Sequence, residues 1–102
     1  MKKTIMVLMS AVVLGFTMNV QAGGDAAAGE AKSANCTGCH GRNGKSTNPN
    51  NPNLAGQKEA YLIKATKAYR DGVRKDPMMS SMVSGLSDAD IADLSAFYSK
   101  VK

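Results

Sequence analysis

The spacing of apolar residues predicts an all-α protein with about three main helices. Apolar side chains recur at helical intervals in three stretches, and no stretch alternates apolar and polar residues as a half-buried strand would. The first predicted helix follows Asp25, a suitable N-cap residue. Its predicted apolar face consists of Ala27, Ala31 and Ala34. Gly29 lies inside this helix, where glycine costs roughly 1 kcal/mol relative to alanine, so we expect another helix to cross closely there.

Two further helices are predicted in the second half of the chain, separated by loops at 41–56 and 73–85. The second helix runs roughly over 58–71 and is followed by Gly72, a good C-terminal stop. Its apolar stripe consists of Leu62, Ala65 and Tyr69. The third helix begins after the N-cap residue Ser87. Its buried stripe is predicted to be Ile91, Leu94, Tyr98 and Val101.

The N-terminal segment has the layout of a secretory signal peptide. A basic head at 1–3 precedes an apolar run at 5–15, and small residues occupy the −3 and −1 positions of a cleavage site after Ala22. The alternative is a membrane anchor, but the run is shorter than the ~20 residues that a spanning helix needs. We therefore predict that residues 1–22 are cleaved, which leaves a single domain over 23–102 without a membrane anchor, exported to the periplasm.

The predicted mature chain is small and mildly basic. Removing Lys2 and Lys3 from the 13 basic residues leaves 11 against 8 acidic residues, a formal charge of +3. This charge is too weak, and too free of basic–aromatic clusters, to indicate nucleic-acid binding. A chain of this length buries a modest core and often depends on a staple or a cofactor.

The basic residues are unevenly distributed along the sequence. Six of them crowd the second predicted helix and the loop after it: Lys58, Lys64, Lys67, Arg70, Arg74 and Lys75. Such a stretch is either an ordinary solvated surface or a patch that steers an acidic partner protein.

The strongest chemical signal is the C-x-x-C-H motif of Cys36, Cys39 and His40, which are the only cysteines and the only histidine of the chain. In the attachment motif of c-type haem, two thioether bonds hold the porphyrin and the histidine ligates the iron. Three alternatives compete: part of a zinc site, a thioredoxin-like redox pair and a local disulfide. The first lacks further ligands, the second lacks a βαβ setting and the third would be strained. The motif therefore favours one covalent haem c with its iron.

Candidates for a second iron ligand are clustered in the loop predicted at 73–85. Met78, Met79 and Met82 are the only methionines after residue 22. A methionine in a loop is often only a packing residue, but a thioether is also the expected partner of histidine in an electron-transfer haem. Spacing alone does not decide between Met78 and Met79.

These motifs resemble those of class I c-type cytochromes. The similarity is to the small single-haem proteobacterial type, which is itself similar to one half of the dihaem respiratory cytochromes. It covers residues 24–101. The segments that carry it are 24–29, 36–41, 52–57, 79–88, 90–94 and 97–98.

The resemblance implies a small cytochrome c fold, in which helices and loops wrap around one covalent haem. The first and last helices would cross near Gly29, which would lie against Leu94 and Phe97 or Tyr98. The haem would sit in the cleft between these helices and the methionine segment, with one edge exposed.

The resemblance also implies two further site residues. In the family the axial methionine lies seven residues before the position of Leu86, which selects Met79. The proline carbonyl that accepts a hydrogen bond from the axial histidine corresponds to Pro52, and this contact would orient His40.

The function implied is electron transfer rather than catalysis. With His/Met ligation, a monomeric carrier would shuttle one electron between partners such as a cytochrome bc-type complex, a haem–copper oxidase or a periplasmic dehydrogenase. The alternative is a haem c subunit of a periplasmic oxidoreductase complex. A gas-binding or peroxidase-like haem would instead need an open iron site.

Overall fold

The computed structural model describes residues 23–102, so the predicted signal peptide lies outside the described residues. This part of the chain is helical and contains no strand, in agreement with the predicted all-α class. None of its helices is long and apolar enough to cross a membrane. The elements in chain order are α1 (Ala26–Lys32), the short 3-10 turn η1 (Ser33–Asn35), α2 (Thr37–His40), η2 (Arg42–Gly44), α3 (Glu59–Arg70), α4 (Pro77–Val83) and α5 (Asp88–Lys100).

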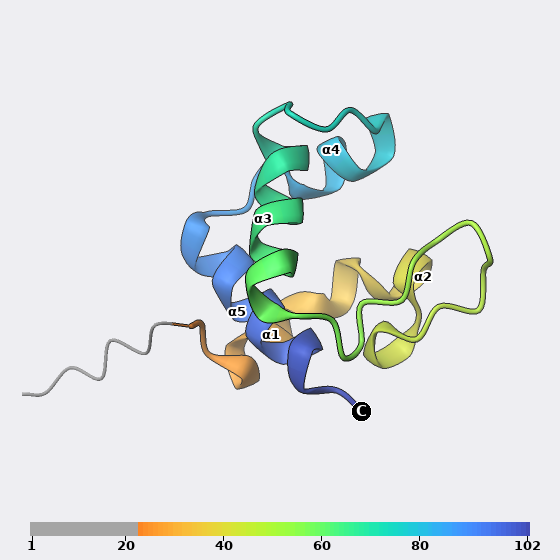
Figure 1. Cartoon of the computed structure of the whole chain (residues 1–102), viewed down its shortest axis with the longest axis vertical. Helices are drawn as coiled ribbons and strands as arrows, with labels where there is room; N and C mark the ends of the chain where they lie inside the picture. Colours follow the sequence, from red (N-terminus) through yellow and green to blue (C-terminus); the bar gives the residue numbers. More distant parts are fainter. Residues whose placement is uncertain (1–22) are drawn as a thin grey trace, which may run out of the picture.

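Helices α1 and α5 cross closely (Figure 1), and Gly29 lies where they meet. This glycine is buried, and a Cβ atom added to it would overlap with the backbone carbonyl of Asp93 and lie 2.9 Å from Cβ of Phe97. The predicted crossing is therefore confirmed. The nearest neighbours of Gly29 are Asp93 and Phe97 rather than Leu94.

The apolar face predicted for the first helix is wrong. Ala27, Ala31 and Ala34 are exposed, whereas Gly29 and Ser33 are the buried residues of this region. Because the backbone of α5 approaches so closely, the residues on the packed face of α1 must be small, and their hydrophobicity matters less. The hydroxyl of Ser33 is satisfied in this position, since it donates a hydrogen bond of 2.7 Å to a carbonyl one turn earlier.

The segment predicted as a loop at 73–85 contains a helix, α4. Its N-cap is Asp76, whose carboxylate accepts hydrogen bonds from the N–H groups of Met78 and Met79, both at 3.0 Å. Pro77 occupies the first helical turn, where its missing N–H group costs nothing. The loop prediction is corrected accordingly: the candidate ligands lie on a capped helix, which packs beside α3 (Figure 1).

The hydrophobic core is small and lies between α3 and α5. Its central cluster consists of Leu62, Leu94 and Tyr98, which confirms these parts of the predicted stripes. Partly buried side chains that pack against this cluster are Cys36, Leu54, Leu86 and Phe97. Cys36, the first cysteine of the C-x-x-C-H motif, therefore packs against the edge of the core.

Arg70 joins the end of α3 to the start of α5. Its Nη1 atom donates hydrogen bonds to Oδ1 of Asp88 at 2.6 Å and to the carbonyl of Leu86 at 3.3 Å, while Nε donates to Asp71 at 2.9 Å. Arg70 thus joins the two ends of the segment that carries α4. The start of α5 is further fixed by Ser87, which is the N-cap residue predicted from the sequence.

Candidate haem site

The C-x-x-C-H motif folds as α2, a single helical turn. Cys36 precedes this turn; its N–H group donates to the carbonyl of Ser33 at 2.8 Å, and its own carbonyl accepts from the N–H of His40 at 3.0 Å. Residues three and four positions apart share one side of a helix, so Cys36, Cys39 and His40 lie on the same side. Gly41 ends the turn with a φ of +81°, a conformation that favours glycine.

The two cysteine side chains are free and half-buried. They are not joined by a disulfide, which disfavours that alternative. Within residues 23–102, no group of three or more His, Cys, Asp or Glu side chains is arranged to hold a metal ion, which disfavours a zinc site. Burial raises the pKa of the Cys36 thiol, because a thiolate would be poorly solvated there.

The imidazole of His40 is buried and held in one orientation. Its side chain is only 7% exposed, and Nδ1 is 2.9 Å from the carbonyl oxygen of Pro52. A carbonyl can only accept a hydrogen bond, so Nδ1 carries the proton and Nε2 retains the lone pair that ligates a metal. A hydrogen bond from Nδ1 to a carbonyl is the usual means of orienting a metal-bound histidine. The structure therefore brings Pro52 and His40 together in the way that the resemblance implied.

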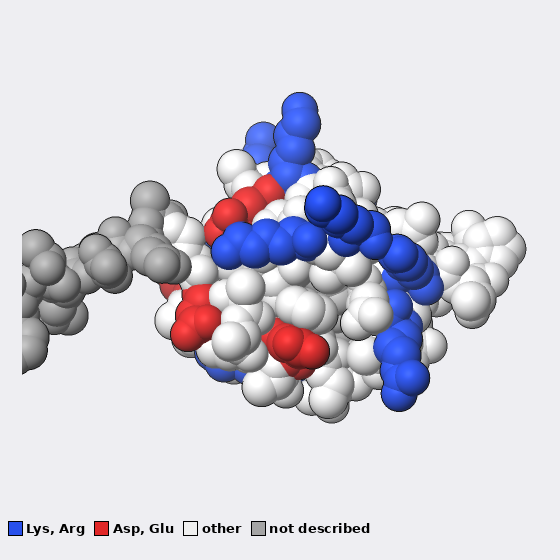
Figure 2. All heavy atoms as spheres, turned by 90° about the horizontal axis from the view of Figure 1, so that it is seen from below, with Lys and Arg blue, Asp and Glu red and all other residues white. Residues whose placement is uncertain are grey.

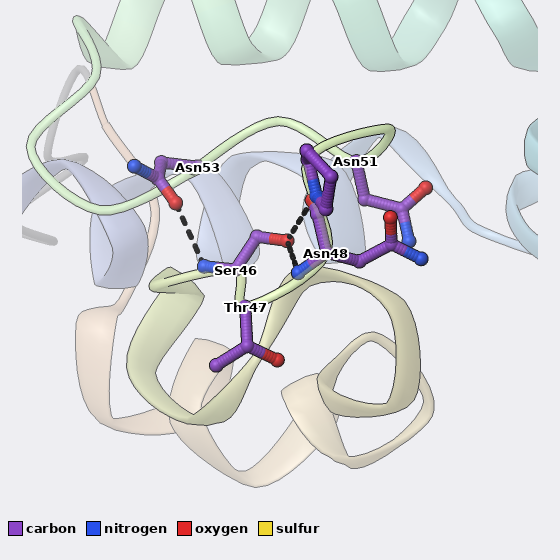
Figure 3. Close-up of a pocket in the computed structure, with 6 residues that line it drawn as sticks. Ser46, Thr47, Asn48, Asn51 and Asn53 are labelled. Atoms are coloured by element: carbon purple, nitrogen blue, oxygen red, sulfur yellow. Dashed lines mark hydrogen bonds between the residues drawn. The ribbon is translucent and has the colours of Figure 1, made fainter.

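The loop that supplies Pro52 is braced by polar side chains on either side of it (Figure 3). Oδ1 of Asn53 accepts a hydrogen bond from the N–H of Ser46 at 2.7 Å. The hydroxyl of Ser46 donates to the carbonyl of Asn48 at 2.9 Å and accepts from its N–H at 3.1 Å. These residues line an open hollow together with Thr47, Pro49 and Asn51. None of the lining residues is ionisable, so the hollow belongs to the bracing of the loop and not to the haem motif.

The loop is also tied to the last turn of α5. The carbonyl of Gly44 accepts hydrogen bonds from Leu54 at 2.8 Å and from Ala55 at 3.1 Å, and Gly56 donates to the carbonyl of Tyr98 at 2.9 Å. Gly44 has a φ of +73°, and a Cβ atom there would lie 2.7 Å from the ring of Tyr98. Gly44 lies in the loop predicted at 41–56 and Tyr98 in a predicted buried stripe, but no local signal in the sequence indicates that they meet.

Tyr98 contributes an apolar ring and a buried hydroxyl to the same region. The residue is 3% exposed, and its hydroxyl has no hydrogen-bond partner among the described residues. Burial, followed by the neighbouring Cys36, raises the pKa of this phenol. Both groups therefore stay uncharged near neutral pH, so the side of the motif that faces the core is compatible with an apolar macrocycle.

Burial distinguishes Met79 from the other two methionines of α4. Met78 is 65% exposed and Met82 is 47% exposed, whereas Met79 is half-buried. The structure does not bring Met79 into contact with the histidine turn: α4 and α2 are well separated in Figure 1. The two candidate ligands therefore come from distant elements.

The model of the Cytochrome c family matches residues 26–102 of this chain. This chain belongs to the cytochrome c family. It is 53% identical over 79 residues to cytochrome c-554(548) of Halomonas halodenitrificans, an alignment that covers 74% of this cytochrome and 95% of the relative. It is 44% identical over 91 residues to cytochrome c4 of Pseudomonas aeruginosa, which covers 89% of this chain and 45% of the relative.

The fold of this cytochrome is likewise that of a solved relative. The crystal structure of reduced recombinant cytochrome c4 from Pseudomonas stutzeri matches with a TM-score of 0.74 and 42% identity, over 78% of this chain and 46% of that one. The chain therefore spans nearly all of the cytochrome c-554(548) sequence but about half the length of the cytochrome c4 relatives.

Membership of this family implies the cofactor, a covalently bound haem c with its iron. The local structure fits this group: two free thiols and an oriented imidazole share one side of a helical turn at the edge of the core. Haem iron supplies one-electron exchange, and the protein contributes attachment, ligation and burial. Electron transport is accordingly the general role of this cytochrome c.

Proposed function

We propose that this protein is a periplasmic electron carrier whose single haem c is attached to Cys36 and Cys39 and ligated by His40 and Met79. The observation that carries the proposal is the hydrogen bond between Nδ1 of His40 and Pro52 at 2.9 Å, which leaves Nε2 free for the iron. The buried ring has lost its rotational freedom before any ligation. This favours fast electron transfer, because the ligand geometry then changes little between the two oxidation states.

The assignment of Met79 as the second ligand is supported by its burial and by the family resemblance. Met79 is the least exposed methionine of this helix, and its N–H group is fixed by the N-cap Asp76. A thioether stabilises the ferrous state and raises the reduction potential relative to a second nitrogen ligand. With both axial positions occupied by side chains, no site would remain for a substrate, which favours a carrier over an enzyme.

The charge distribution supports a partner with an acidic docking surface. Of the six basic residues around α3, Lys67 and Arg70 form ion pairs with Asp88. The others form no ion pair within the described residues: Lys58, Lys64, Arg74 and Lys75. On the face seen from below, Figure 2 shows basic side chains from the top through the middle to the right-hand side, and acidic side chains toward the left and the lower part. Partners of this kind include a cytochrome bc-type complex, a haem–copper oxidase and a periplasmic dehydrogenase.

Two exposed apolar side chains beside the candidate ligand are also compatible with a second possibility. Met78 and Met82 lie one turn apart on α4 and are both exposed. Such a pair suits either a transient redox complex or a permanent haem c subunit of a periplasmic oxidoreductase. Purification from the native source distinguishes the two, since a subunit would elute with a larger protein at fixed stoichiometry and a carrier would elute alone.

Covalent attachment is tested by extraction of the purified protein with acid acetone. We expect the haem to remain with the polypeptide, and Cys36→Ala or Cys39→Ala to lower the yield of haem-containing protein, because one thioether bond is lost. Haem that leaves the polypeptide, or zinc in its place, would contradict the proposal.

Ligation by methionine is tested by the weak sulfur-to-iron band at the red end of the ferric spectrum. Met79→Ala should abolish this band and lower the reduction potential. Met78→Ala and Met82→Ala are the matched controls on the same helix and should retain it. If Met78→Ala alone removes the band, the ligand is Met78 and the assignment is wrong by one residue.

A further inference from the structure

Glu59, the first residue of α3, carries a carboxylate oxygen that lacks a hydrogen-bond donor. Its Oε1 atom is inaccessible to solvent and has no hydrogen-bond partner among the described residues. An acidic residue in the first turn of a helix is favoured by the helix dipole. The dipole explains the residue type, but it does not satisfy a buried acceptor, and an unsatisfied charged group is costly to bury.

The oxygen lies against Gly23. A Cβ atom added to Gly23 would overlap with Oε1 of Glu59 and lie 3.1 Å from its Cδ atom. The backbone of the residue at which the predicted mature chain starts is therefore in direct contact with the unpartnered carboxylate. A side chain at this position would displace the carboxylate of Glu59.

The position of Gly23 is fixed by the two residues that follow it. Gly24 packs on the backbone of α5, where a Cβ atom would overlap with Ala92. The N–H group of Asp25 donates a hydrogen bond of 2.8 Å to Oδ1 of Asp93. The segment before α1 is thus held against α5. The position of Gly23 can therefore change only by rotation about its own backbone bonds.

We propose that the α-ammonium group of Gly23 forms an ion pair with the carboxylate of Glu59 in the mature protein. This inference rests on the proposed cleavage after Ala22. A signal peptidase would hydrolyse the Ala22–Gly23 peptide bond with one water molecule, which leaves a carboxylate on Ala22 and an ammonium group on Gly23. Removal of the leader then creates the group that completes the contact.

Cleavage makes the two partners more strongly complementary. Within the uncleaved chain the nitrogen of Gly23 is a neutral amide with one hydrogen and a direction set by the peptide plane. The ammonium group has a full charge and three N–H donors that turn freely, and charge-assisted hydrogen bonds are the stronger class. Because Oε1 is shielded from water, the pair is screened less than an exposed ion pair.

The experiment uses the exported protein with its haem attached, whose intact mass identifies the first residue. We expect the mass of a chain that starts at Gly23. Glu59→Gln keeps the size of the side chain and removes its charge, and it should lower the melting temperature by roughly 4–8 °C, the shift that corresponds to a loss of about 1 kcal/mol in a domain of this size. The matched control is Glu30→Gln, since Glu30 is the only other glutamate and is exposed on α1; its melting temperature should change little.

A second measurement removes the ammonium group instead of the carboxylate. Transamination of the α-amino group with pyridoxal phosphate converts it to a carbonyl and leaves lysine side chains unchanged. The treatment should destabilise the parent protein by about as much as Glu59→Gln does and should have no further effect on that variant. This arm remains informative if Glu59→Gln fails to fold.

Three outcomes would overturn the pairing. They are an unchanged melting temperature after transamination, strictly additive effects of the two changes, and a first residue other than Gly23. In each case a normal haem spectrum would leave the proposed electron-transfer function intact, so the two proposals fail independently.

Discussion

Gly29 lies directly against the backbone carbonyl of Asp93, so that α1 and α5 touch through their main chains. A methyl group at this position has no room and would push the helices apart. We expect Gly29→Ala to reduce the free energy of unfolding by about 1–3 kcal/mol, the usual cost of overpacking. This net loss remains after the roughly 1 kcal/mol by which alanine favours a helix. Urea unfolding of the haem-containing protein measures the change.

Gly85→Ala provides the control for that substitution. A Cβ atom at Gly85 would have no atom within 4 Å, and its φ is not positive. The variant should be as stable as the parent or slightly more stable, since alanine restricts the unfolded chain. A Gly29→Ala protein that behaves in the same way would contradict the close crossing.

Arg70 should control the mobility of the segment that carries α4. Its hydrogen bonds to Leu86 and Asp88 close the base of this segment. We expect Arg70→Gln to accelerate amide hydrogen exchange in α4 and to leave α1 unchanged. Arg74→Gln, which removes a cation stacked 4.5 Å over the ring of Tyr69 but none of these hydrogen bonds, is the control. Equal exchange rates in the two variants would show that Arg70 does not fasten the segment.

The acid stability of the fold should depend on Lys32 and its two carboxylate partners. The hydrogen bond from Lys32, followed by that from the backbone of Ser87, lowers the pKa of Asp90 to about 2, and Lys32 also lowers the pKa of Asp93. A carboxylate with a lowered pKa stabilises the fold at pH values above its ordinary pKa and loses this effect as the pH falls through the folded value. We therefore expect the melting temperature to fall between about pH 4 and pH 2.

Asp90→Asn tests this contribution, because asparagine retains an oxygen for the Ser87 N–H but cannot be charged. The variant should be less stable at pH 7, and its melting temperature should depend less steeply on pH below 4. Glu30→Gln should keep the slope of the parent. An Asp90→Asn protein with the parent's acid profile would show that the ion pair contributes nothing measurable.

Electron exchange with an acidic partner should slow as the salt concentration rises. Opposite charges accelerate association, and salt screens them over ~8 Å at physiological ionic strength. Lys58→Glu with Lys64→Glu changes two residues that form no ion pair in the described part of the chain, so the fold should be preserved. Stopped-flow rates at low salt should fall in this variant while its spectrum and potential remain unchanged. Electron-exchange rates that change neither with salt concentration nor with the charge reversal would favour an apolar docking surface.

Local chemistry explains which features of the fold could be predicted. Asp25 and Ser87 cap helices through their own side chains, and Gly72 ends α3 with a φ of +79°. These signals act within a few residues and are visible in the sequence. The cap of α4 is equally local, since Asp76 precedes Pro77, although the sequence predicted a loop over 73–85.

Contacts between distant residues explain what could not be predicted. The buried face of α1 depends on how closely α5 approaches, and a sequence pattern of alanines does not report that distance. The contact of Gly44 with Tyr98 joins residues 54 positions apart. Pro52 was identified only through the family resemblance, because no rule of spacing links a proline carbonyl to a histidine twelve residues earlier.

The attachment of the 44–56 loop to Tyr98 has a consequence for the order of assembly. In the proposed export from the N-terminus, the cysteine motif would emerge before the final turn of α5. Until Tyr98 arrives, Gly44 and Gly56 lack their anchor, so the Pro52 carbonyl has no fixed place beside the imidazole. The motif would therefore be less constrained while the haem is attached to the two thiols. The loop would become fixed only when the end of the polypeptide folds, after the haem has been attached.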